Sequence, residues 1–194
     1  HFSYSQIVFR IENKNPEIRF ESFVISGVEM HKNNLNKSIG EIFNADGKKV
    51  SVVLEKPIPE AISKYYTKYN GVAEHKKKIL IKIKHLELNE KRNTNAIEGK
   101  ILYEMEAWHI SENDTSRLCR ATNKGQYSRN LGSKNIDNVQ NQVKTALDGG
   151  LIYLVNYVRN FGSQLEAFAS DSEVKILPLF SKNSADTVYY QQRK

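Results

Sequence analysis

The sequence has little of what would identify an enzyme or a membrane protein at once. Among its 194 residues there is one cysteine, Cys119, so no disulfide can form within the chain. The longest unbroken apolar stretch of its most apolar region covers residues 149–155, far short of the ~20 residues that span a bilayer. No catalytic or cofactor motif stands out. These absences exclude a disulfide scaffold and a transmembrane helix.

Arginine is also scarce for so basic a chain. The formal net charge is +7, but the 29 basic residues comprise 21 Lys and only 8 Arg. Arg is the side chain that bidentate recognition of phosphate and guanine favours. The basic composition therefore indicates compositional bias and solubility rather than a specific nucleic-acid partner.

The residues that are present predict a folded domain. Hydrophobic residues make up 39% of the chain, with ten Tyr and eight Phe, and the length suits one domain with extensions. The chain begins at His1 rather than at a methionine, so we expect a processed or truncated N-terminus. One explanation is a removed signal peptide, with or without a lipid-anchor cysteine upstream. The other is the boundary of an expressed fragment.

The first part of the chain has the alternation of β-strands. Apolar and polar residues alternate over residues 5–12 and again over 17–26, with a turn sequence between them. A change of parity between Phe20 and Phe23 predicts a bulge in the second strand.

A hairpin and a helix follow. Asp46-Gly47 stands before another alternating segment, which predicts a tight turn between two strands. Residues 56–71 have helical spacing, with Pro59 suited to the first turn and Gly71 to the end. The predicted buried face of this helix consists of Ile62, Tyr65, Tyr66 and Tyr69.

Three consecutive strands are predicted over residues 77–90, 96–111 and 116–128. In the first, the apolar parity changes near Lys84 and His85, so a bulge there would turn both apolar sets toward the core. The third strand is the most polar, which is typical of a sheet edge.

The last strong element is a helix over residues 135–161, with Asn135 or Ser133 as its cap. Its apolar stripe consists of Ile136, Val139, Val143, Ala146, Leu147, Leu151, Leu154, Val158 and Phe161. Gly150 falls near the centre of this stripe, and Gly149 lies off it. A glycine inside a helix costs about 1 kcal/mol relative to alanine, so we interpret Gly150 as permitting close helix–sheet contact.

These elements predict an α+β fold. We expect a two-layer sandwich, with a mostly antiparallel sheet and two helices, near 59–70 and 135–161, packed on one face. Residues 1–161 would form a single domain, and 162–194 a C-terminal extension with a strand broken at Pro178.

Several residues have the chemistry of an active site without its spacing. Glu104 and Glu106 share one strand face, which we interpret as a solvated sheet face. His85 and His109 lie on neighbouring strands, but neither shows a metal-ligand spacing. Cys119 has flanks that match no nucleophile, so we interpret it as a small buried residue. We therefore predict no catalytic residue, no metal and no cofactor.

The most suggestive surface is a basic run on the third strand. No acidic residue occurs between Asp114 and Asp137, and an anionic polymer, a lipid headgroup or an acidic protein could bind there. Its alternative is an edge strand protected from aggregation by its charges. Together with the aromatic ring of the preceding strand, the candidate binding residues are Trp108, Arg117, Arg120, Lys124, Tyr127 and Arg129.

One stretch resembles a known group of proteins. From residue 49 to about 161 the segments "KILIKIKHLEL", "GKILYEMEAWHIS" and "RLCRATNKGQY", followed by "VQNQVKTALDGGLIYLVNYV", are similar to the small α/β domain of the TolB N-terminal-like group. That group includes accessory lipoproteins of bacterial envelope systems. The resemblance implies a non-enzymatic envelope protein that works by contact, and it supplies no catalytic residues.

The favoured hypothesis is thus an extracytoplasmic accessory or scaffold protein that contacts an envelope protein through the face around Trp108 or the basic edge. The alternative is a carrier or sensor of a small or lipidic ligand held between the sheet and the helix of Gly150. An enzyme that uses His85, His109 and the glutamates would require these side chains to converge.

Overall fold

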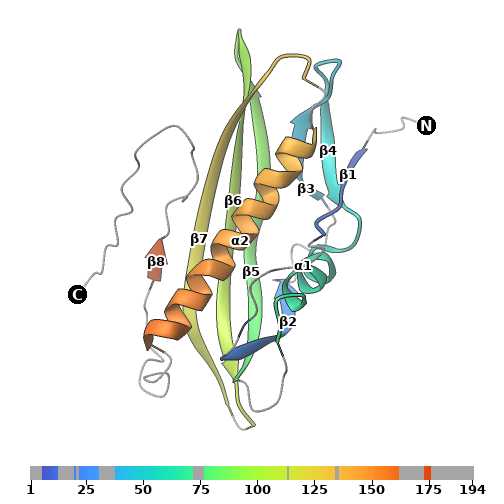
Figure 1. Ribbon diagram of the computed structural model, residues 1–194. Coiled ribbons are helices and arrows are strands. Elements are labelled where there is room, and N and C mark those ends of the chain that lie inside the picture. The colour runs from blue at the N-terminus through green and yellow to red at the C-terminus, as the bar shows by residue number, and fades with distance from the viewer. Residues whose placement is uncertain are drawn as a thin grey trace.

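The computed structural model describes residues 6–12, 20, 22–30, 38–71, 77–112, 114–133, 136–161 and 173–175, with residues 161 and 173–175 as backbone only. Within them the chain forms eight strands and two helices (Figure 1). In chain order these are β1 (Gln6–Phe9), β2 (Phe23–Met30), β3 (Ser38–Phe43), β4 (Lys49–Leu54), α1 (Ile58–Thr67), β5 (Lys77–Arg92), β6 (Ala96–Ile110), β7 (Thr115–Asn130), α2 (Ile136–Phe161) and β8 (Glu173–Lys175). The predicted α+β class, with two helices against a sheet, is confirmed.

The strands form one mixed sheet in the order β1-β4-β3-β5-β6-β7-β8. Its centre is the antiparallel meander of β5, β6 and β7, and β3 is antiparallel to β4. Parallel pairs join β1 to β4, β3 to β5 and β8 to β7. The remaining strand, β2, lies parallel to the first half of β5, on the same edge that β3 meets further along. Two short strands therefore share one edge of β5.

The predicted bulge in β5 is confirmed. The register between β5 and β6 shifts between Ile83 and His85, so Ile83 before the shift and Leu86 after it are both buried. The sequence also predicted a bulge between Phe20 and Phe23, but β2 begins at Phe23 and its register shift falls between Ile25 and Gly27.

Helix α1 begins where the sequence predicted. Pro59 stands in its first turn, where a missing N–H removes no helical hydrogen bond. Ile62, Tyr65 and Tyr66 are buried, and Tyr69 packs partly buried just beyond the helix end. The predicted hairpin is also present, with Gly47 at a φ of 74° in the turn between β3 and β4.

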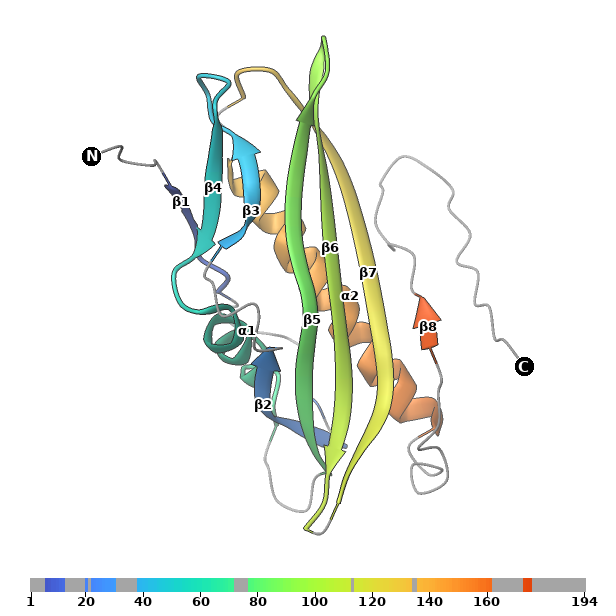
Figure 2. The ribbon, with the colours of Figure 1, turned by 180° about the vertical axis from the view of Figure 1, so that it is seen from behind.

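Helix α2 crosses the sheet, in front of it in Figure 1 and behind it in Figure 2. Most of the predicted stripe is buried: Val139, Val143, Ala146, Leu147, Leu151, Leu154 and Val158. A Cβ on Gly150 would lie 2.7 Å from the Tyr103 ring, which confirms the close helix–sheet contact. Gly149, predicted to lie off the stripe, is just as close, because a Cβ there would meet the Asn123 amide at 2.0 Å.

The end of the chain is described only in part. Strand β8 lies beside Arg120–Thr122 of β7, so the strand that was predicted to be an edge has a neighbour there. The rest of residues 162–194, and the predicted cap Asn135, lie outside the described residues. Neither of the two described helices combines the length and the apolar character of a membrane span.

Candidate functional site

The sheet face opposite the helices, here called the outer face, carries the sequence's main binding candidates. Strand register aligns Gly27, Leu80, Trp108 and Arg117 in one row across β2, β5, β6 and β7. The next row consists of Glu29, Lys82, Glu106 and Arg120, so its charges alternate in sign. Directly paired side chains of one sheet face are close enough to interact.

Trp108 is held on this face by polar contacts. Its Nε1 donates to a Glu106 carboxylate oxygen at 3.2 Å, and the Lys82 ammonium lies 4.2 Å from the ring centroid. A cation over an aromatic face is attracted by the ring quadrupole. The half-buried indole is thus held by Glu106 at its edge and by Lys82 over its face, without any partner bound.

Glu104 and Glu106, on the outer face of β6, are both covered by cations. Glu106 contacts Lys84 and Arg117, each at 3.5 Å, and Glu104 accepts two hydrogen bonds from Arg120. The predicted solvated face is therefore wrong here, because Glu104 and Glu106 are only 8% and 5% exposed. Long basic side chains of the neighbouring strands lie over the shorter carboxylates and remove them from water. We call the eight residues Leu80, Lys82, Lys84, Glu104, Glu106, Trp108, Arg117 and Arg120 the Trp108 patch.

The structure separates the six predicted binding residues into two groups. Trp108, Arg117, Arg120 and the exposed Lys124 lie on the outer face. Tyr127 and Arg129 point to the helix side, as do the buried residues of their parity on β7, Ala121 and Asn123. Strand alternation would have separated Tyr127 and Arg129 from Arg120 and Lys124. It would have placed Arg117 with the former two, but the register shift at Leu118 turns Arg117 to the outer face.

On the helix side, Arg129 and Tyr127 form a closed network with Glu90. One Glu90 oxygen accepts from the Tyr127 hydroxyl at 2.7 Å and from Arg129 Nε at 2.8 Å. The other accepts from the Phe43 amide and from Arg129 Nη2, both at 2.7 Å. Arg129 also donates to the carbonyls of Phe43 and Ser133. The network joins β3, β5, β7 and the turn after β7.

The pKa values in this network follow from its hydrogen bonds. Burial alone would raise the pKa of Glu90, but the bonds from Arg129, the Phe43 amide and Tyr127 outweigh it and lower that pKa. The hydrogen bond with Glu90 in turn raises the pKa of Arg129. Burial, together with the Glu90 carboxylate, raises the pKa of the Tyr127 phenol. The pair is therefore ionised at neutral pH.

The two histidines do not converge. His85 pairs with Glu104 on the outer face and contacts Glu87 at 3.4 Å. His109 pairs with Ile79, a buried residue of the helix side. His85 and His109 lie on opposite faces of the sheet, so they do not meet in one site with the glutamates. Among the described residues there is no group of three or more potential metal ligands.

Cys119 lies in the core, as expected of a small buried residue. Burial raises the pKa of its thiol to about 12. A thiol with this pKa is almost entirely protonated at neutral pH, and the thiolate is the nucleophilic form.

A second, partly buried polar cluster was missed from the sequence. The hydroxyls of Tyr65 and Tyr69 both donate to one carboxylate oxygen of Asp148, at 2.8 and 2.9 Å. Beside it, the Tyr66 hydroxyl lies 2.8 Å from that of Tyr103. Burial raises the pKa of Asp148, although the two phenol hydrogen bonds act against it. The available signal was a single acid, next to Gly149, inside the apolar region of the helix.

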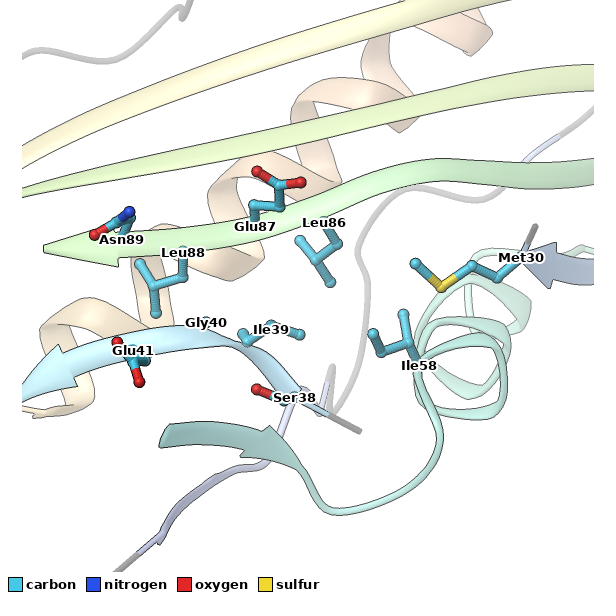
Figure 3. Close-up of a pocket in the computed structure, with 10 residues that line it drawn as sticks. All are labelled: Met30, Ser38, Ile39, Gly40, Glu41, Ile58, Leu86, Glu87, Leu88 and Asn89. Carbon is cyan, nitrogen blue, oxygen red and sulfur yellow. The ribbon is translucent and has the colours of Figure 1, made fainter. Parts of the chain in front are cut away.

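One notch in the sheet edge is lined by both apolar and polar side chains (Figure 3). It opens where β2 ends and β3 begins along the edge of β5, and its volume is about 320 Å³. Its lining residues are Met30, Ser38, Ile39, Gly40, Glu41, Ile58, Leu86, Glu87, Leu88 and Asn89. Met30 and Ser38, which flank the segment 31–37 that lies outside the described residues, both line the notch. The notch is not the space predicted for a ligand beside Gly150, where Tyr103 fills the contact.

Comparisons with known proteins give no functional identification. No family model and no curated protein matches the chain, so these comparisons add no evidence for the resemblance to the TolB N-terminal-like group. Among solved structures, the chain is similar to protein XCC0632 from Xanthomonas campestris, assigned to DUF330, with a TM-score of 0.46 and 12% identity over 84% of this chain and 100% of that one. An uncharacterised protein matches with a TM-score of 0.34 and 8% identity over 84% of this chain and 98% of the other.

Proposed function

We propose that the protein is a non-catalytic accessory or scaffold protein of the cell envelope, which binds a partner protein on its outer face. The observation that supports this function best is the position of Trp108, the only tryptophan of the chain. It lies between Lys82 and Glu106, with Arg117 beside it. Trp and Arg are enriched among the residues that dominate protein interfaces.

The contacts within the Trp108 patch favour binding because they fix its side chains in advance. Ordering a mobile side chain at an interface costs about 0.5–1.5 kcal/mol, and this cost is smaller where the rotamer is already held. The alternating charges of the second row add a pattern that a partner must match, which favours specificity over raw affinity.

The extracytoplasmic location, the anchor upstream of His1 and the relation to the TolB N-terminal-like group belong to the same proposal, and their support is in the sequence. The alternative function, a carrier of a small ligand, has less support. Gly150 contacts Tyr103, so no space remains there for a ligand.

Site-specific photo-crosslinking in the cells that naturally express the protein tests this function. A photoreactive amino acid replaces Thr115, which is exposed beside Arg117 on the outer face, or Ile152, which is exposed on α2. We expect a defined crosslinked protein from position 115 that is absent from position 152. Trp108→Ala should reduce its yield about tenfold or more, the scale of a hot-spot residue.

Two results would contradict the proposal. Equal crosslinking from both positions would show that the partner does not prefer the outer face. An undiminished yield with Trp108→Ala, in a variant whose circular dichroism spectrum matches the wild type, would remove Trp108 from the contact.

A further inference from the structure

Strand β2 has one edge that no described strand covers. It pairs with β5 on one side only. On its other side the Asn70 amide accepts from the Ile25 N–H at 2.9 Å and donates to the Ile25 carbonyl at 3.0 Å. These are the two hydrogen bonds that a neighbouring strand would make. Asn70 thus takes the place of a neighbouring strand at Ile25. After the register shift, over residues 27–30, no described strand pairs with this edge of β2.

A groove runs between this open edge and α1. Gly27 and Val28 line one wall, the exposed face of the helix lines the other, and the volume is about 490 Å³. The helix wall consists of Lys56, Pro59, Glu60, Ser63, Lys64 and Thr67. Figure 2 shows α1 next to β2 at the side of the sheet. A groove between a strand edge and a helix is the setting in which extended peptides add a strand to a sheet.

The charges of the helix wall are balanced. Lys56 is paired with Glu60, and Lys64 lies 3.7 Å from Glu12. The wall therefore offers no net charge for a partner, and specificity must come from the backbone edge and from the outer face.

The two cross-strand rows of the outer face end at this edge. The first row ends at Gly27, which has no side chain to cover Leu80. The second row ends at Glu29, which is exposed, and its charges alternate along Glu29, Lys82, Glu106 and Arg120. A strand added beside β2 would extend both rows. An apolar side chain opposite Gly27 would cover Leu80, and a basic one opposite Glu29 would continue the alternation.

We propose that the partner contributes an extended segment that adds to the open edge of β2. The segment has an apolar residue opposite Gly27 and a Lys or Arg two positions away, opposite Glu29, because residues two apart share one face of a strand. This inference rests on the proposed function, since it places the strand at the margin of the Trp108 patch.

A short synthetic peptide tests the edge with purified protein. The probe is the blocked heptapeptide Thr-Lys-Thr-Leu-Thr-Lys-Thr, whose lysines flank the leucine on the same face and so suit either strand direction. The control is Thr-Lys-Leu-Thr-Thr-Lys-Thr, with the leucine on the opposite face. Backbone hydrogen exchange is followed over residues 27–30, and the fluorescence of Trp108 reports on the adjoining patch. We expect the probe, and not the control, to slow exchange there and to shift the tryptophan emission.

A charge reversal makes the register specific. Glu29→Lys should weaken the probe about 2- to 5-fold, the range of a cross-strand ion pair. A peptide with glutamate in place of lysine should show the reverse preference. Glu29 is exposed, so the variant should remain folded.

The outcomes separate this inference from the function beneath it. Protection by both peptides alike, protection elsewhere, or none at all would overturn strand addition, even if crosslinking from position 115 captures a partner. Protection by the probe and not by the control supports strand addition at β2. If crosslinking from position 115 then captures no partner, the proposed function fails and strand addition does not.

Discussion

Two pairs of glutamate and arginine, one on each face of the sheet, have the same chemistry and different surroundings. On the helix side, the side chains of Glu90 and Arg129 are 0% and 5% exposed. On the outer face, those of Glu106 and Arg117 are 7% and 33% exposed. The inner pair is completed by Tyr127 and by the backbone of Phe43, whereas the outer one lies among Lys84, Trp108 and solvent.

The difference shows that the same residue types can serve stability or recognition. The inner pair is bonded to the backbone of β3, to Tyr127 and to the turn after β7, so it joins strands that are not neighbours in the sheet and faces other segments of this chain. The outer pair keeps its arginine partly in water, where a partner can reach it. Variants of the two arginines test this contrast directly, and variants of Gly150 and Asp148 measure what other contacts of the helix side contribute to stability.

The largest effect is expected at Arg129. Arg129→Met leaves the Glu90 carboxylate buried without its cation, and loss of one partner of a buried pair costs about 3–5 kcal/mol. The matched change in the outer pair is Arg117→Met, which should cost about 1 kcal/mol or less, because Arg117 is partly exposed and Glu106 keeps its contact with Lys84. Urea denaturation of both variants measures the free energies of unfolding. Equal losses would show that burial does not distinguish the two faces.

Gly150→Ala should have an intermediate effect. The new methyl group would lie 2.7 Å from the Tyr103 ring and 3.4 Å from the Met105 sulfur, and overpacking of this kind costs about 1–3 kcal/mol. The gain of about 1 kcal/mol in helix propensity offsets part of this. We expect a lower midpoint of thermal unfolding. Asn156→Ala, at an exposed position of the same helix, is the control and should not destabilise. An increase in stability for Gly150→Ala would contradict the close contact.

The smallest effect concerns Asp148 and pH. Its pKa is raised in the folded protein, so the folded state binds more protons than the unfolded state between the usual carboxyl pKa of about 3.9 and the raised value. The free energy of unfolding therefore falls as pH rises through that window. The stability that the raised pKa of Asp148 contributes is fully present only below the window. Asp148→Asn should remove this slope, with a change of about 1 kcal/mol or less at neutral pH.

Tyr69→Phe sharpens the same measurement. It removes one of the hydrogen bonds that lower the pKa of Asp148, so the window should widen toward higher pH. Free energies of unfolding, measured from pH 4 to pH 8 for the wild type and both variants, show whether Asp148 causes this pH dependence. An identical pH dependence in the wild type and in Asp148→Asn would exclude a role for this carboxyl.

Local pattern determined much of the fold. Alternation located the long strands, and the parity change near Lys84 located the bulge in β5, because both depend on which side of one strand each residue faces. Helical spacing identified the buried stripe of α2 and the close contact at Gly150. Turn residues and helix-end residues predicted the hairpin at Gly47 and the start of α1 at Pro59.

Tertiary structure decided what depends on residues far apart in sequence. The pattern of single strands could not show that β2 and β3 share one edge of β5, nor that Asn70 covers the other edge of β2 at Ile25. It could not show which carboxylates would be covered, because Glu106 is removed from water by side chains of two other strands. Amino-acid identity determines what a side chain can do, but burial and partners are set by the segments that packing brings beside it.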